Sequence, residues 1–95
     1  AAEHDVEEVV DIDFRFHTTF GKAARNLFLF EFQEILLRLL GRYVYLGFQV
    51  EGNLEGAISD HRVILAALRT HDPDACELAV RSHIGNGRER MRSAL

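Results

Sequence analysis

Four side chains of metal-ligating type stand where the sequence is otherwise apolar. Asp13 and His17 are four residues apart, so a helix would stack them on one face. His61 and His83 each lie within apolar residues at helical spacing. An ionised carboxylate in an apolar interior is costly unless something pairs with it or coordinates it. One carboxylate and three imidazoles suit Zn²⁺, Ni²⁺, Mn²⁺ or Fe²⁺, with open positions left to water or a ligand.

Apolar residues recur every three or four positions along the chain, which predicts an all-α fold of four helices. The first is expected over about residues 3–19, with Gly21 as its stop. The second begins near Asn26, a good N-cap residue, and runs to at least Leu40. We expect it to continue through residues 43–50, although the composition there would also suit a strand. Because only a narrow polar stripe interrupts its apolar surface, most of this helix is expected to be buried.

Two turns separate the remaining helices. Gly52 marks the first, and Asn53 is expected to cap a third helix that runs to about Thr70. Asp72 can accept hydrogen bonds from the free amides of the fourth helix, and Pro73 fits the first helical position because its missing N–H costs nothing there. The fourth helix is therefore expected to run from Pro73 almost to the end of the chain.

The turn between the third and fourth helices predicts that His61 and His83 are level. His61 lies about nine residues before the turn and His83 about ten residues after it, so at 1.5 Å per residue both are roughly 14–15 Å from the connection. An antiparallel hairpin with so short a loop brings the two rings side by side. Nothing in the sequence fixes where the first helix docks, so its convergence with this pair is a hypothesis.

Length, charge and cysteine content limit the kinds of protein to which this chain can belong. With 95 residues the chain has room for one domain. Cys76 is the single cysteine, which excludes an internal disulfide and, with no signal-peptide pattern at the start, favours the cytoplasm. No apolar run approaches the roughly 20 residues that span a bilayer. The formal net charge of −4 makes nucleic acid an unfavourable partner for this segment on its own.

Five segments together resemble the C-terminal (FCD) domain of FadR-type GntR transcriptional regulators. The segment DFRFH at 13–17 is similar to the family's D-x-x-F/L-H element. In the third helix, Asp60 stands where the family more often has Glu. The other similar segments are AARNLFL at 23–29, DHRVILAAL at 60–68, DPDA at 72–75 and VRSHI at 80–84. The resemblance extends over about residues 11–91.

The resemblance implies an antiparallel helical bundle that binds a small carboxylate effector at a divalent metal, rather than an enzyme. Zn²⁺ is the first expectation, with Ni²⁺, Mn²⁺ or Fe²⁺ as alternatives. Asn26, besides capping its helix, and Arg42 are candidates for effector contacts. The domain would form a homodimer, and no membrane is involved. The metal ligands would be Asp13, His17, His61 and His83.

Family members usually carry a winged helix-turn-helix DNA-binding domain and further helices before the D-x-x-F/L-H element. This chain begins almost at that element. We therefore expect residues 1–95 to be a metal-holding, effector-binding and dimerisation domain, as a fragment that lacks the family's first helices. DNA would then be a partner only through the N-terminal domain, which this chain does not contain.

Simpler interpretations compete with a metal site. A single histidine on an apolar face is more often a hydrogen-bonded core residue than a ligand. His4 and His71 lie in polar surroundings and are expected to be solvated, and Cys76 is expected to be a small buried residue. Two other functions stay open: a small metal-dependent enzyme that uses the same Asp/His site, and a metal-free helical dimerisation module. The lack of a general base or nucleophile outside the proposed ligands argues against the enzyme.

Overall fold

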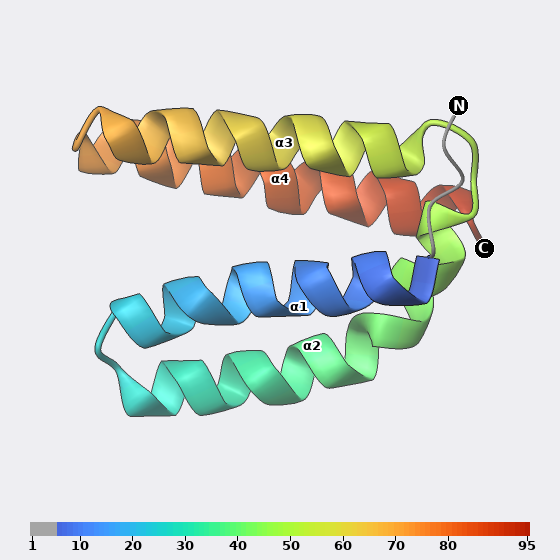
Figure 1. Cartoon of the computed structure of the whole chain (residues 1–95), viewed down its shortest axis with the longest axis horizontal. Helices are drawn as coiled ribbons and strands as arrows, with labels where there is room; N and C mark the ends of the chain where they lie inside the picture. Colours follow the sequence, from blue (N-terminus) through green and yellow to red (C-terminus); the bar gives the residue numbers. More distant parts are fainter. Residues whose placement is uncertain (1–5) are drawn as a thin grey trace. The chain divides into compact units, whose positions relative to one another are not determined.

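The computed structural model describes residues 6–95, which form four α-helices (Figure 1). No strand occurs among these residues, so the all-α prediction is confirmed. No helix in this range combines the length and the hydropathy that a membrane crossing needs. The chain divides into two compact units, Ala1–Tyr45 and Leu46–Leu95, and each is described by itself. The helices are α1 (Val6–Ala23), α2 (Leu27–Phe48), α3 (Asn53–Arg69) and α4 (Pro73–Ser93).

The first helix ends later than the sequence predicted. Residues 3–5 of the expected helix, and with them His4, lie outside the described residues. At the other end, α1 continues through Gly21, so the expected stop there was wrong. The helix ends before Arg25, which takes a left-handed φ of 55° that cannot continue a right-handed helix. Gly21 instead makes room between helices, because a Cβ there would collide with the side-chain oxygen of Gln33 on α2 and lie tightly against the Phe30 ring.

Two contacts show that α1 and α2 are antiparallel, because the residue nearer the start of α1 contacts the residue further along α2. The Gln33 side chain of α2 donates a hydrogen bond to the carbonyl oxygen of His17 at 2.8 Å. Further along α2, the Arg38 guanidinium lies 4.9 Å from the centroid of the Phe14 ring, which is earlier in α1. The two helices of the first unit therefore pair antiparallel, as a hairpin.

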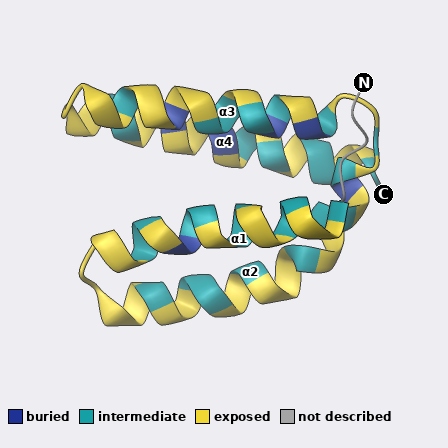
Figure 2. Cartoon of the chain, viewed as in Figure 1, coloured by how far each residue is buried: buried dark blue, intermediate teal, exposed yellow. Residues whose placement is uncertain are grey.

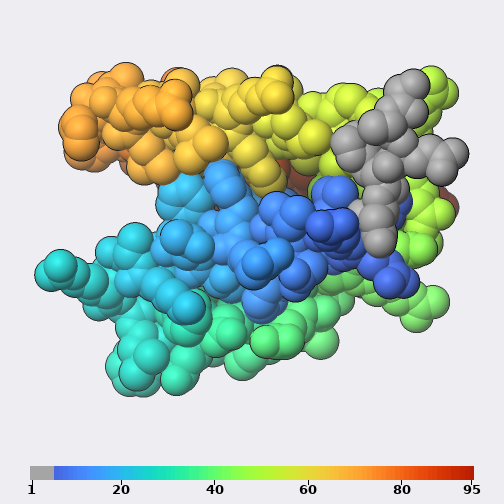
Figure 3. Space-filling model, viewed as in Figure 1, coloured from blue at the N-terminus to red at the C-terminus, as the bar shows by residue number. Residues whose placement is uncertain are grey.

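The second helix has the predicted start and length but not the predicted burial. The Asn26 side chain accepts a hydrogen bond from the Leu29 amide at 3.1 Å, as an N-cap residue should. Many apolar side chains of α2 are nevertheless exposed, among them Phe28 at 74% and Leu39 at 68%. Figure 2 colours most of α2 as exposed, and Figure 3 shows its side chains standing on the surface. The expected burial was wrong because α1 covers one side of α2, whereas apolar residues occupy most of its circumference.

The side chain of Asn53, which was predicted to cap α3, instead holds the loop before that helix. Gly52 has a φ of 88°, which a glycine adopts without strain, and makes the predicted turn. The prediction that Asn53 caps α3 was wrong, since no side-chain cap bond forms there. The Asn53 amide instead donates hydrogen bonds to the carbonyl oxygens of Gly47 at 2.8 Å and Arg90 at 3.3 Å. Asn53 thereby ties this loop to the last turns of α4.

The fourth helix starts as predicted. The Asp72 carboxylate accepts a hydrogen bond from the Asp74 amide at 3.0 Å, and Pro73 occupies the first turn. His71 has a φ of 58°, so the chain reverses within a few residues and α4 returns alongside α3 (Figure 1). The hairpin of α3 and α4 therefore forms as its short loop required. Its buried apolar residues are Leu54, Ala57, Ile64 and Ala79.

Candidate metal site

Two of the predicted ligands lie one helical turn apart on α1. The Nε2 atom of His17 is 3.3 Å from Oδ1 of Asp13, and the side chains are 21% and 13% exposed. Two ligands of a tetrahedral zinc ion, each about 2.0–2.2 Å from the metal, lie roughly 3.3–3.5 Å apart. The predicted stacking is confirmed, and the spacing of these two atoms fits neighbouring ligands of one ion.

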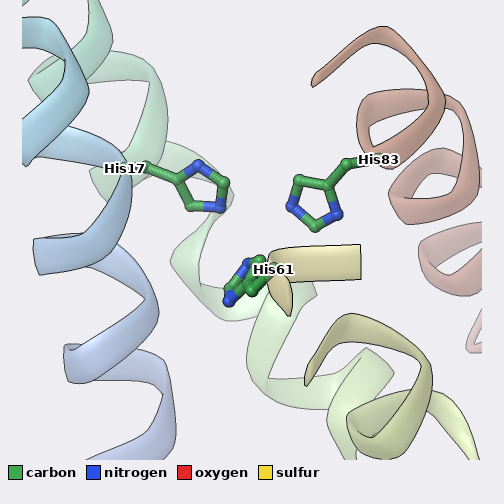
Figure 4. A group of neighbouring side chains, drawn as sticks. All are labelled: His17, His61 and His83. Atoms are coloured by element: carbon green, nitrogen blue, oxygen red, sulfur yellow. The ribbon is translucent and has the colours of Figure 1, made fainter. Parts of the chain in front are cut away.

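The other two predicted ligands meet across the α3–α4 hairpin. The ring centroids of His61 and His83 are 4.8 Å apart, with the planes at 73°. Their ligand nitrogens lie within 4.8 Å of each other, close enough for small side-chain movements to bring both onto one cation. Figure 4 draws these two rings, together with His17, which α1 carries in the first unit. The prediction that His61 and His83 are level is confirmed.

A carboxylate that was not among the predicted site residues contacts His83. Oδ2 of Asp60 lies 3.0 Å from Nδ1 of His83. An ionised carboxylate can only accept, so a hydrogen bond between these two atoms has Nδ1 as its donor. The Arg90 guanidinium also comes within 3.5 Å of Nδ1 and, as a donor, would favour the opposite tautomer, but the contact with Asp60 is shorter, at 3.0 Å.

Asp60 accepts hydrogen bonds from two further side chains of α4. Arg90 donates to Oδ2 at 2.7 Å and Asn86 donates to Oδ1 at 3.1 Å. Burial raises the pKa of Asp60, but the hydrogen bonds from His83, Arg90 and Asn86 and the charge of Arg90 outweigh it and lower the pKa below 3.8. His83, Asn86 and Arg90 follow one another at spacings of three and four. The sequence shows this polar face of α4, but it does not show that Asp60 is the group that the face contacts.

The two candidate effector residues lie at different places on the first unit. Asn26 is exposed and lines a groove of about 360 Å³ at the turn between α1 and α2. Arg42 is exposed on α2 and lines neither this groove nor a second one, of about 390 Å³, along α1 and α2. The second groove is lined by Asp13, Phe14 and Arg38, among others. Arg38 is therefore the arginine of α2 that shares a groove with a predicted metal ligand.

The residues predicted to lie outside the site are placed as follows. His71 is exposed in the turn before α4, which confirms its predicted solvation. Cys76 is only half-buried in the first turns of α4, so its expected burial is partly wrong.

The family follows from comparison with known proteins. A family model of the FCD domain matches residues 1–86. The chain belongs to the FCD domain family. This domain is the C-terminal effector-binding domain of FadR-like regulators of the GntR family. No curated protein and no solved structure gave a significant match.

Replacing Asp60 by Asn should make the free energy of unfolding fall less as the pH is lowered into the acid range. Because the folded-state pKa of Asp60 is lowered, its stabilising contribution is present above about pH 3.8 and is lost as pH falls through the folded-state pKa. We expect Asp60→Asn to lower the free energy of unfolding by about 1.5–3 kcal/mol near neutral pH. The difference from the wild-type chain should shrink toward zero in strong acid, measured by urea unfolding across a pH series.

Glu77→Gln is the matched control for this experiment. It removes the same charge from an exposed ion pair with Arg81, whose side chains are 60% and 76% exposed. Such a surface pair contributes little to stability. A destabilisation by Asp60→Asn that was equal at neutral and strongly acid pH would contradict the prediction.

Proposed function

We propose that this domain senses a small carboxylate metabolite through a divalent metal. The observation that carries the proposal is the pair of imidazoles from α3 and α4, whose ligand nitrogens lie within 4.8 Å of each other. The Asp60 carboxylate lies 3.0 Å from Nδ1 of His83, which favours Nε2 as the nitrogen of that ring that would bind the metal. The pair occurs in a chain whose family consists of regulatory effector-binding domains. Zn²⁺ is the first candidate, with Ni²⁺, Mn²⁺ or Fe²⁺ as alternatives. The proposed ligands are Asp13, His17, His61 and His83.

The proposed ligands form two pairs, and each unit of the chain assembles one of them. Asp13 and His17 are spaced by a single helix, and His61 and His83 by a hairpin. If both pairs share one ion, α1 is linked to the α3–α4 hairpin. A protein-bound cation with open positions offers a strong site for a carboxylate. The effector would thus favour the arrangement in which the pairs converge, because a ligand shifts an equilibrium only through differential affinity for its states.

In the regulator, this change would be passed on to a DNA-binding domain. A winged helix-turn-helix domain, N-terminal to the segment described, would contact the DNA in the cytoplasm. The formal net charge of −4 agrees with a sensing role for residues 1–95 themselves, because phosphate-binding surfaces are basic. Asn26 and Arg42 remain proposals as effector contacts.

Metal content tests the ligand set directly. We expect the purified chain to bind about one equivalent of Zn²⁺ tightly, and His83→Ala to lose most of this affinity, because removal of one of four ligands opens the site. Elemental analysis after dialysis, followed by competition with a chelator, measures both. His71→Asn is the control: it removes an exposed imidazole, and Asn tolerates the left-handed φ of 58° at this position. Full retention of metal by His83→Ala would argue strongly against the site.

A panel of small carboxylates separates the sensor from the enzyme. With Zn²⁺ present, a genuine effector at 100 times its Kd should stabilise the folded state by about 2.7 kcal/mol and raise Tm saturably. The same carboxylate should have no comparable effect on the metal-stripped chain. Chromatography of the incubated carboxylate checks for turnover. Conversion of a panel member would favour the metal-dependent enzyme over the sensor.

We further propose that the domain forms a homodimer through the apolar face of α2. Four exposed side chains on this face, Phe28, Phe32, Ile35 and Leu39, alternate at spacings of four and three, as in the contact seam of paired helices. They are 74%, 63%, 56% and 68% exposed. Contiguous apolar surface of this kind usually marks an interface. A second copy presents the same face and could cover it.

A charge placed in this seam should weaken the dimer. We expect Leu39→Lys to raise the dissociation constant roughly tenfold or more, because an unpaired buried charge costs several kcal/mol. Sedimentation equilibrium over a range of concentrations measures the change. Gln49→Lys adds the same charge at an exposed position beyond the end of α2 and should leave association unchanged. Equal association of the two variants would count against an α2 interface.

A further inference from the structure

We infer that Asp60 is a positioning residue of the metal site, which holds His83 in the Nδ1–H tautomer and leaves Nε2 for the cation. The inference rests on the proposed metal site and names the group that sets the state of one of its ligands. A neutral imidazole can carry its proton on either nitrogen, and the hydrogen bond made by one nitrogen decides which. Here that bond is the 3.0 Å contact between Nδ1 and Oδ2.

The position of Asp60 makes its effect specific to this site. It directly precedes His61 on α3, so adjacent residues supply one ligand and the acceptor that orients the other. The oriented ring of His83 lies 4.8 Å from the ring of His61, centroid to centroid. Metal-binding histidines commonly donate their second N–H to a carboxylate, which fixes the ring and makes the ligand nitrogen more basic. The contact seen here has the chemistry and geometry of that arrangement.

Arg90 and Asn86 hold the Asp60 carboxylate in place. Arg90 donates to the oxygen that His83 uses, at 2.7 Å, and Asn86 donates to the other oxygen at 3.1 Å. The side chains of Arg90 and Asp60 are only 15% and 16% exposed, so turning the carboxylate away would leave a nearly buried guanidinium unpaired. The Arg90 guanidinium passes close to Gly56 on α3, where a Cβ would lie 3.3 Å from Nη1 of Arg90.

An isosteric change at Asp60 would disrupt this arrangement chemically rather than sterically. Asparagine keeps the shape but offers one oxygen to three donors, from His83, Arg90 and Asn86. Its amide group would also face a donor at the position of the second oxygen. His83 would then be free to turn or to change tautomer, while the apolar contacts of α3 and α4 are unchanged.

The tautomer can be measured without metal on the 95-residue chain. Long-range ¹H–¹⁵N spectra above the ordinary imidazole pKa of about 6.5 distinguish the two neutral forms. His83→Gln identifies the resonances. We expect His83 to carry its proton on Nδ1 in the wild-type chain and in Glu77→Gln, and to lose this preference in Asp60→Asn. An Nε2–H tautomer of His83 in the wild-type chain would overturn the inference, whether or not Asp60→Asn folds.

Affinity for Zn²⁺ alone provides the second readout. We expect Asp60→Asn to bind Zn²⁺ roughly 10–100-fold more weakly, as is typical when a partner of a ligand is lost. Glu77→Gln should match the wild type, and Asp60→Glu should recover most of the affinity because it keeps a carboxylate within reach of Nδ1. If the wild type binds Zn²⁺ and Asp60→Asn binds it equally well, the inference fails while the proposed function stands. If the wild type binds none, both fail.

Discussion

The described site depends on one carboxylate that serves three donors. Asp60 can only accept, and its two oxygens are engaged by His83, Asn86 and Arg90 from successive turns of α4. A displacement of α4 by one turn along α3 would leave these partners unpaired inside the hairpin, which is costly for charged groups. The network therefore fixes the register of the two helices. That register, in turn, places His83 beside His61.

The same network shows how polar groups can stabilise a small unit. The apolar core of the second unit is modest, and small units bury a low fraction of their surface. Asn53 adds to the polar framework at the open end of the hairpin, where it binds the carbonyl oxygen of Arg90. Arg90 is thus held at its backbone by the loop before α3 and at its side chain by Asp60. The histidine pair is built on a frame held by directional bonds as well as by packing.

The first unit differs from the second in leaving much of its apolar surface exposed. Its contacts between α1 and α2 include polar ones, such as the hydrogen bond from Gln33 to the carbonyl oxygen of His17. Much of the apolar surface of α2 is exposed. Under the proposed function this contrast has a use: an apolar face can join two copies, while the donor pair on α1 can respond to an ion and its carboxylate ligand. Sensing and association would then be carried by different faces of one helix pair.

Local features were determined by the sequence itself. Asn26 and Asp72 start their helices because their side chains reach free amides a few residues ahead, and the pairing of His61 with His83 follows from helical rise and a short loop. Tertiary structure alone decided that Asp60 would contact His83, because the donors to Asp60 lie 23 to 30 residues away in the sequence. In the sequence, the polar face of α4 that carries these donors cannot be told from a polar face that only contacts solvent. It also decided the burial of α2, since periodicity reveals an apolar surface but not what covers it.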